Sequence, residues 1–141
     1  MTDSIHAALW EWFMQCSAIT KLFFNFSTAK DTDTVIATAG DSVLEEYIDG
    51  SQRRRYAFEL SRYCPITFIQ NDTGNIEMLE DAQAIAHWVE EQNAEGNLPV
   101  LPAGYAVESV VVLDEYAGYT TGIDQNTAKY MIPFALDYLK G

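Results

Sequence analysis

The chain has 141 residues and a formal net charge of −13, because 21 aspartates and glutamates outnumber eight lysines and arginines. A hydrophobic content of 48% excludes a disordered chain, and the length suits one domain, residues 1–141, with a single core. The strongly negative average field disfavours binding to nucleic acid or to an anionic membrane, and no apolar run is long enough to span a bilayer.

The first predicted element is an amphipathic helix that begins after the N-cap candidates Thr2, Asp3 and Ser4. Its core stripe has apolar residues at spacings of three and four: Ile5, Leu9, Trp12, Phe13, Cys16 and Ile19. Trp10 and Met14 lie on a different face, so the apolar surface of the helix is wider than a single contact with the core requires. Either a partner contacts this second face, or the rest of the domain wraps around it.

A long β-hairpin is predicted from Ser42 to Pro65, with a candidate short strand at 35–39 ahead of it. Asp49-Gly50 is a strong turn signal, because glycine tolerates the positive φ that tight hairpin turns demand. The second strand alternates Arg54, Tyr56, Phe58, Leu60 and Arg62 on one face with Arg53, Arg55, Ala57, Glu59 and Ser61 on the other. We expect the first face in the core and the second in solvent or against a partner.

A second helix is predicted from the region of Asn75 to near Gly96, and two strands follow at 107–115 and 130–138. Pro133 lacks an N–H donor, which predicts that the last strand lies at an edge or that its proline faces outward. The order α-β-β-α-β-β predicts an α+β fold: an antiparallel sheet of about four strands with two helices packed on one face.

No motif for catalysis, a cofactor or a metal is recognisable in the sequence. His6 and His87 lack a second ligand at helical spacing, and Asp31 and Asp33 do not continue into a calcium loop. There is also no glycine-rich phosphate loop and no serine nucleophile motif. We therefore expect no enzyme, no metal and no cofactor. The remaining enzymatic hypothesis is a small-molecule site built from Tyr116, Tyr119 and scattered carboxylates, since the loop from Tyr116 to Thr127 is long enough to be functional.

The three consecutive arginines of the hairpin stand out in an acidic chain. On a strand Arg53 and Arg55 share one face and Arg54 occupies the other, so the run does not suit a nucleic acid backbone. Two interpretations remain. The arginines pair across the hairpin with Glu45 and Glu46, or some of them reach acidic patches on a neighbouring subunit. The interface candidates are Arg53, Arg55, Trp10, Met14, Tyr116 and Tyr119.

Several stretches of this chain, spread from about residue 3 to residue 140, resemble a family of proteins found in long-tailed bacteriophages. They are Tyr47–Gly50 with the basic run after it, Tyr56–Leu60, Asn75–Leu79 with Trp88, Leu98–Gly104 and Tyr130–Tyr138. The family comprises the small tail-terminator or minor capsid proteins encoded in the head-to-tail gene block of siphophages and related prophages.

The resemblance implies an α/β domain that forms a ring, typically a hexamer, which caps the tail tube and docks to head-completion proteins. Its partners would be other copies of itself, the major tail tube protein and the head-completion protein. It would lie at the tail-head junction of the virion, and in the host cytoplasm during assembly. DNA would pass an acidic lumen without specific binding, because like charges avoid counterion release. Another head-to-tail joining or minor capsid component is the alternative.

Overall fold

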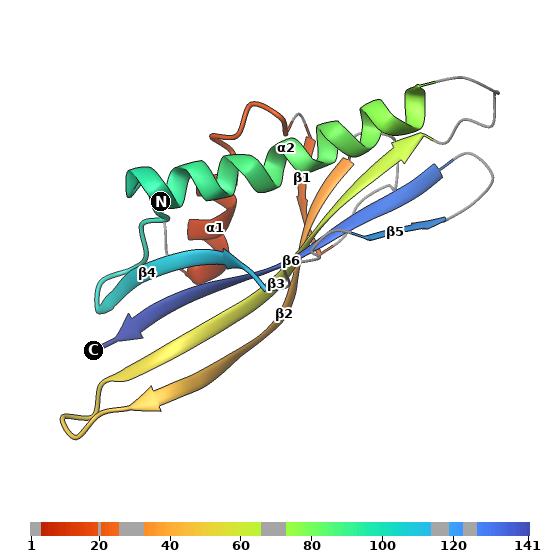
Figure 1. Ribbon diagram of the computed structural model, residues 1–141. Coiled ribbons are helices and arrows are strands. Elements are labelled where there is room, and N and C mark those ends of the chain that lie inside the picture. Colours follow the sequence, from red (N-terminus) through yellow and green to blue (C-terminus); the bar gives the residue numbers. More distant parts are fainter. Residues whose placement is uncertain (1–3, 20, 26–32, 66–72, 114–118, 123–126) are drawn as a thin grey trace.

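The computed structural model describes residues 4–19, 21–25, 33–65, 73–113, 119–122 and 127–141 (Figure 1). Its elements are α1 (Ile5–Phe13), β1 (Lys21–Phe24), β2 (Asp33–Glu46), β3 (Gln52–Pro65), α2 (Gly74–Glu95), β4 (Tyr105–Val112), β5 (Tyr119–Gly122) and β6 (Thr127–Lys140). The predicted α+β class is confirmed. The sheet has six strands, however, where about four were expected.

The sheet runs β1-β2-β3-β6-β4, and β5 pairs with β6 beside that path. All pairings are antiparallel except β1 with β2, which is parallel over Lys21–Phe24 and Asp33–Ile36. The candidate strand at 35–39 and the first strand of the hairpin are one continuous β2. A register shift between Thr38 and Gly40 joins them, because a bulge bends a strand without ending it.

The sequence predicted either an edge strand or an outward-facing proline at Pro133, and the first alternative is wrong because β6 is a central strand. Pro133 lies opposite Glu59 of β3, and its carbonyl accepts a hydrogen bond of 3.0 Å from the N–H of Leu113. The N–H and C=O of one residue point to the same side of a strand, so a donor at position 133 would point to the side of β4 and β5. At this position the neighbour of β6 changes from β4 to β5, so the missing N–H leaves no ladder hydrogen bond unmade. A central strand therefore tolerates this proline. Pro133 stands on the face away from the helices, half-buried.

Both helices pack on one face of the sheet, as predicted. The predicted core side of β3 and β6 is confirmed, since Tyr56, Phe58 and Leu60 are buried and pair in register with buried residues of β6. The other side is not left to solvent as expected, because Ser61, Ala135 and Asp137 on it are also buried. Phe58 and Phe134 stack with ring centroids 5.5 Å apart. Phe13 of α1 lies against Phe58. The core therefore forms where the two central strands meet the helices.

Each helix has a local reason for its ends and its buried side. The hydroxyl of Ser4 caps α1 by accepting the N–H of Ala7, and Gly96 ends α2 in the left-handed conformation. In α2 the buried residues Ile85 and Val89 lie in the second half of the helix. In the described parts of the chain, no helix is long and apolar enough to cross a membrane.

Candidate functional site

The hairpin of β2 and β3 projects from the body of the domain and ends in a short loop (Figure 1). Glu46 pairs with Gln52, so the loop spans Tyr47–Ser51 and is longer than a two-residue turn. Gly50 has a φ of 89°, and the carboxylate of Asp49 accepts the N–H of Ser51 at 2.9 Å. The turn predicted at Asp49-Gly50 is thus confirmed in position, with Gly50 in the conformation that glycine adopts most readily.

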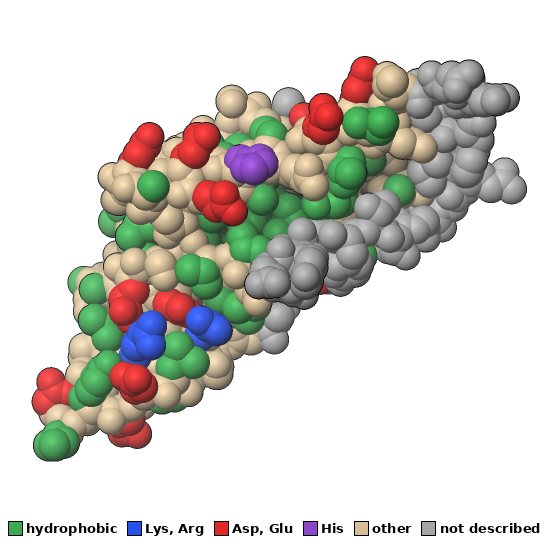
Figure 2. Space-filling model, viewed as in Figure 1, with side chains coloured by type: hydrophobic (Ala, Val, Ile, Leu, Met, Phe, Trp, Pro, Cys, Tyr) green, Lys and Arg blue, Asp and Glu red, His purple; other side chains and the backbone are tan. Residues whose placement is uncertain are grey.

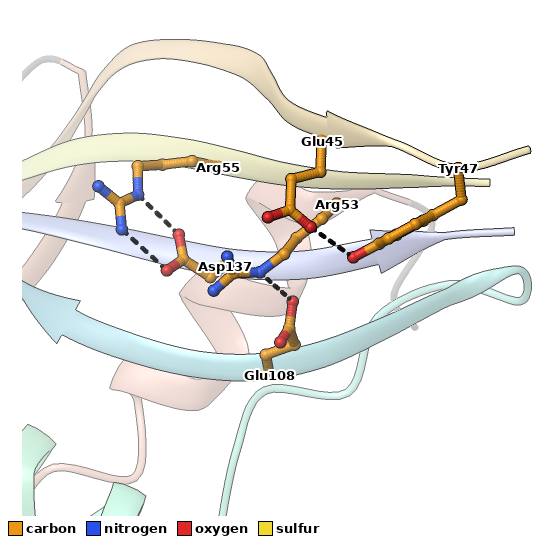
Figure 3. Close-up of polar contacts among 6 residues, drawn as sticks. All are labelled: Glu45, Tyr47, Arg53, Arg55, Glu108 and Asp137. Atoms are coloured by element: carbon orange, nitrogen blue, oxygen red, sulfur yellow. Dashed lines mark hydrogen bonds and ion pairs between the residues drawn. The ribbon is translucent and has the colours of Figure 1, made fainter.

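Arg53 of β3 forms an ion pair with an acidic residue of β4, which lies beyond β6 in the sheet. Its Nε donates to Oε1 of Glu108 in β4 at 2.8 Å (Figure 3). Glu108 is the extra residue of a bulge between Val107 and Ser109, and bulges re-aim side chains in this way. The contact raises the pKa of the Arg53 guanidinium. The pair is about one-third exposed at both ends, so it contributes little to stability.

Arg55 makes the stronger pair, with Asp137 of β6, its direct neighbour in the register. Nε and Nη2 of Arg55 donate to the two carboxylate oxygens at 2.7 and 2.9 Å (Figure 3). Asp137 is only 3% exposed, on the face away from the helices. The bidentate bond raises the pKa of Arg55 and supplies the partner that a buried carboxylate needs.

Arg54 belongs to a different network, on the helix side of the sheet. Its Nε lies 3.3 Å from Oδ1 of Asp41, and the hydroxyl of Tyr138 donates to the other oxygen of that carboxylate at 2.7 Å. Burial, followed by the bond to Asp41, raises the pKa of Tyr138 to about 12. The three neighbouring arginines therefore bind three carboxylates on three different strands.

The predicted pairing of the arginines with Glu45 and Glu46 is wrong in its partners. Glu45 does stand opposite Arg53, but it accepts a hydrogen bond of 2.8 Å from the hydroxyl of Tyr47 (Figure 3). The partners that sequence reasoning missed are Asp41, Glu108 and Asp137. Only Asp137 left a signal, because it falls on the outward side of the alternating run Tyr130–Tyr138.

The interface candidates on α1 are not brought together with the arginines. Trp10 is half-buried on α1 and Met14, at the end of that helix, is 61% exposed, both on the helix side of the sheet. Arg53 and Arg55 face the opposite side. Tyr119 begins β5 and pairs with Met131, far along β6 from the arginines, and Tyr116 lies outside the described residues. The described side chains of Arg53, Arg55, Trp10 and Met14 therefore do not form a single site.

The end of the hairpin carries an exposed apolar surface beside its charged one. Its members are Val43, Leu44, Tyr47, Ile48 and Leu139, between 37% and 109% exposed. Figure 2 shows hydrophobic side chains at this projecting end next to basic side chains surrounded by acidic ones. Exposed apolar residues that gather in this way are typical of protein contact surfaces.

A cavity of about 350 Å³ lies between the start of α1, β2, β3 and the segment before β4. It is lined by Ser4, Ile5, His6, Asp41, Tyr56, Pro102 and Tyr105. Its main polar groups already have partners within the chain: His6 Nδ1 lies 2.6 Å from the hydroxyl of Tyr56, and Asp41 binds Arg54 and Tyr138. In the described chain, no group of three or more histidine, cysteine or acidic side chains is placed to hold a metal.

No protein-family model and no curated protein matches this sequence. The fold does have solved relatives. One is a chain of a structure described as "Virion of native gene transfer agent (GTA) particle", with a TM-score of 0.61. The match covers 98% of this chain and 96% of the other, at 13% sequence identity. The two chains therefore share a fold over nearly their whole lengths.

Proposed function

We propose that this protein is a structural component of a phage-like virion, which caps the end of the tail tube as a ring and docks to head-completion proteins. The observation that carries the proposal is the fold likeness to a chain of a gene transfer agent virion over 98% of this protein. The tail-end position comes from the family resemblance of the hairpin, the second helix and the last strand.

The surface of the hairpin supports an assembly role. It is long, projects from the domain and combines exposed Ile48, Leu44 and Val43 with charged residues fixed in position by ion pairs. A ring needs two different patches on each subunit, because a head-to-tail contact joins unlike surfaces. The hairpin supplies one patch, and the exposed Met14 at the end of α1 belongs to a second.

The net charge of −13 suits a ring through which DNA passes. A duplex gains affinity for a protein when cations of the protein displace its counterions, and an acidic lumen offers no such gain. Arg53, Arg54 and Arg55 are each engaged by a carboxylate of the same chain, which further lowers their availability to phosphate.

The direct test is assembly on tail tubes. Purified major tail tube protein of the same phage or prophage would be polymerised with and without this protein, and tube lengths measured by negative-stain electron microscopy. We expect shorter tubes that end in a ring of density. Bovine serum albumin, which is also acidic, is the control for nonspecific effects.

Unchanged tube length with no density at the tube ends would overturn the terminator role. Another head-to-tail joining component, the alternative, would leave tube growth unchanged but bind the head-completion protein in a pull-down. Size-exclusion chromatography with light scattering would show whether the ring exists before it meets a tube.

A further inference from the structure

The outer edge of β2 changes character along its length. From Asp33 to Ile36 it pairs with β1, and at Thr38 the backbone N–H donates to the side chain of Asn25 at 3.1 Å. From Gly40 to Glu46 every residue is exposed, and no described strand pairs with the outer side. In Figure 1 this half of β2 forms the outermost line of the hairpin. It is an open strand edge.

The opposite edge of the sheet is closed at the corresponding place. The side-chain amide of Asn93 in α2 donates to the carbonyl of Val110 in β4, and its oxygen accepts the N–H of Val110 at 2.9 Å. One side chain thus satisfies both backbone groups that a further strand would need. Proteins cover sheet edges where pairing would be harmful. The half of β2 from Gly40 to Glu46 has no such cover among the described residues.

The open edge is apolar and acidic. Val43 is 46% exposed and Leu44 is 40% exposed. The seven residues from Gly40 to Glu46 include the acidic Asp41, Glu45 and Glu46, and none of the seven is basic. Cross-strand neighbours of opposite charge stabilise a sheet, and like charges destabilise it. An added strand is therefore favoured when it is basic.

We propose that the edge of β2 from Gly40 to Glu46 binds an extended, lysine- or arginine-bearing segment of another protein as an added antiparallel or parallel strand. Main-chain hydrogen bonds hold such a segment, and the side chains select it. A second copy of this chain is a poorer occupant, because two β2 edges would bring Glu45 and Glu46 of both copies together.

Val43 lies in the middle of the open edge, and the direction of its backbone N–H follows from the hydrogen-bonding pattern of the hairpin. In an antiparallel ladder, hydrogen-bonded and non-hydrogen-bonded residue pairs alternate. Tyr47 and Ser51 are hydrogen-bonded, so Glu45 and Arg53, two positions further, are a hydrogen-bonded pair as well. Leu44 is the extra residue of a bulge, and the next pair, Val43 and Arg54, is therefore non-hydrogen-bonded. The N–H of Val43 therefore turns outward. Val43→Pro removes this donor at a place where an edge strand tolerates proline, and Val43→Thr keeps it.

The test uses the full chain and an eight-residue acetylated peptide that alternates lysine and valine. Fluorescence anisotropy measures its affinity, and amide chemical shifts show where it binds. We expect shifts at Gly40–Glu46, and binding to the Val43→Pro variant that is at least about tenfold weaker. Val43→Thr should bind within about twofold of the original, and a peptide with glutamate in place of lysine should not bind.

Three results would overturn the proposal. The first is equal binding to wild type and Val43→Pro, since that variant keeps the net charge and nonspecific attraction would persist. The second is peptide-induced shifts confined to residues outside the edge. The third is a concentration-dependent shift of the edge amides without peptide, which would identify a second copy as the occupant. A protein that fails to cap tail tubes could still bind the peptide, so the two proposals fail separately.

Discussion

Arg55 and Asp137 stand directly opposite each other in the β3–β6 register and are joined by two hydrogen bonds, of 2.7 and 2.9 Å. Asp137 is 3% exposed, whereas the side chain of Arg55 is 35% exposed. The carboxylate is therefore the dependent partner: it has little access to water and relies on the guanidinium, while Arg55 retains access to solvent.

Asp137→Asn should destabilise the protein by about 1–2 kcal/mol, because the amide keeps one acceptor but loses the charge-assisted bidentate bond. The matched control is Glu108→Gln, which breaks the exposed pair with Arg53 and should cost less than about 0.5 kcal/mol. Urea unfolding followed by circular dichroism measures both. Equal losses in the two variants would contradict the difference in burial.

Phe134→Ala should cost about 3–5 kcal/mol, because the ring is 0% exposed and stacks on Phe58 at the centre of the core. Met14→Ala should change the free energy of unfolding by less than about 0.5 kcal/mol, since Met14 is 61% exposed. If Met14 belongs to a subunit contact, the same variant should weaken ring formation in light scattering. A large loss of monomer stability in Met14→Ala would argue against a free surface there.

Asn93→Leu should leave the N–H and carbonyl of Val110 without their partner and cost about 1–3 kcal/mol. Hydrogen exchange at the Val110 amide should accelerate, and the opened β4 edge should promote association at high protein concentration. Glu91→Leu, at an exposed position on the same helix, is the control for added apolar surface. Unchanged exchange at Val110 would show that another group protects this edge.

Stability should fall between about pH 10 and pH 12 through Tyr138. Burial and the bond to Asp41 raise the pKa of its phenol from 10.0 to about 12. The folded state then holds a proton that the unfolded chain releases, so the stabilisation is complete below pH 10 and is lost as the pH rises toward 12. Two pKa units correspond to roughly 2–3 kcal/mol at most.

Tyr138→Phe should flatten part of this decline in the free energy of unfolding, and the buried Tyr56, whose pKa is also raised by burial, should account for some of the rest. Tyr63→Phe is the control for the loss of a phenol hydroxyl, because Tyr63 is a half-buried residue of β3 on the face away from the helices. An alkaline decline of the same slope in Tyr138→Phe would exclude Tyr138 as a source.

A charge swap can separate the intrachain role of Arg53 from a role between subunits. Arg53→Glu places a second carboxylate beside that of Glu108, and the repulsion should lower the stability of the monomer and weaken assembly. Adding Glu108→Arg restores the ion pair with reversed polarity, so monomer stability should return. Light scattering and electron microscopy then read assembly alone. If the double variant assembles like the wild type, neither charge contacts a neighbouring subunit.

The sequence by itself determined which residues share a face. The alternation from Arg53 to Arg62 and from Tyr130 to Tyr138 predicts the core sides of β3 and β6, because a strand turns successive side chains to opposite faces whatever its neighbours are. The glycine turn at Gly50 and the start of the first helix were equally local, but that helix ends at Phe13, so the prediction that Cys16 and Ile19 continue it was wrong. These features depend on residues a few positions apart, and that information lies in the chain itself.

The tertiary structure alone decided which strands meet. It placed β6 between β3 and β4, so that Arg55 meets Asp137 from 82 residues away, and it used a bulge at Glu108 to supply a partner for Arg53. It also placed Pro133 in a central strand, where the change of neighbour removes the need for its N–H. Strand order and bulges depend on packing between distant segments, and periodicity carries no information about them.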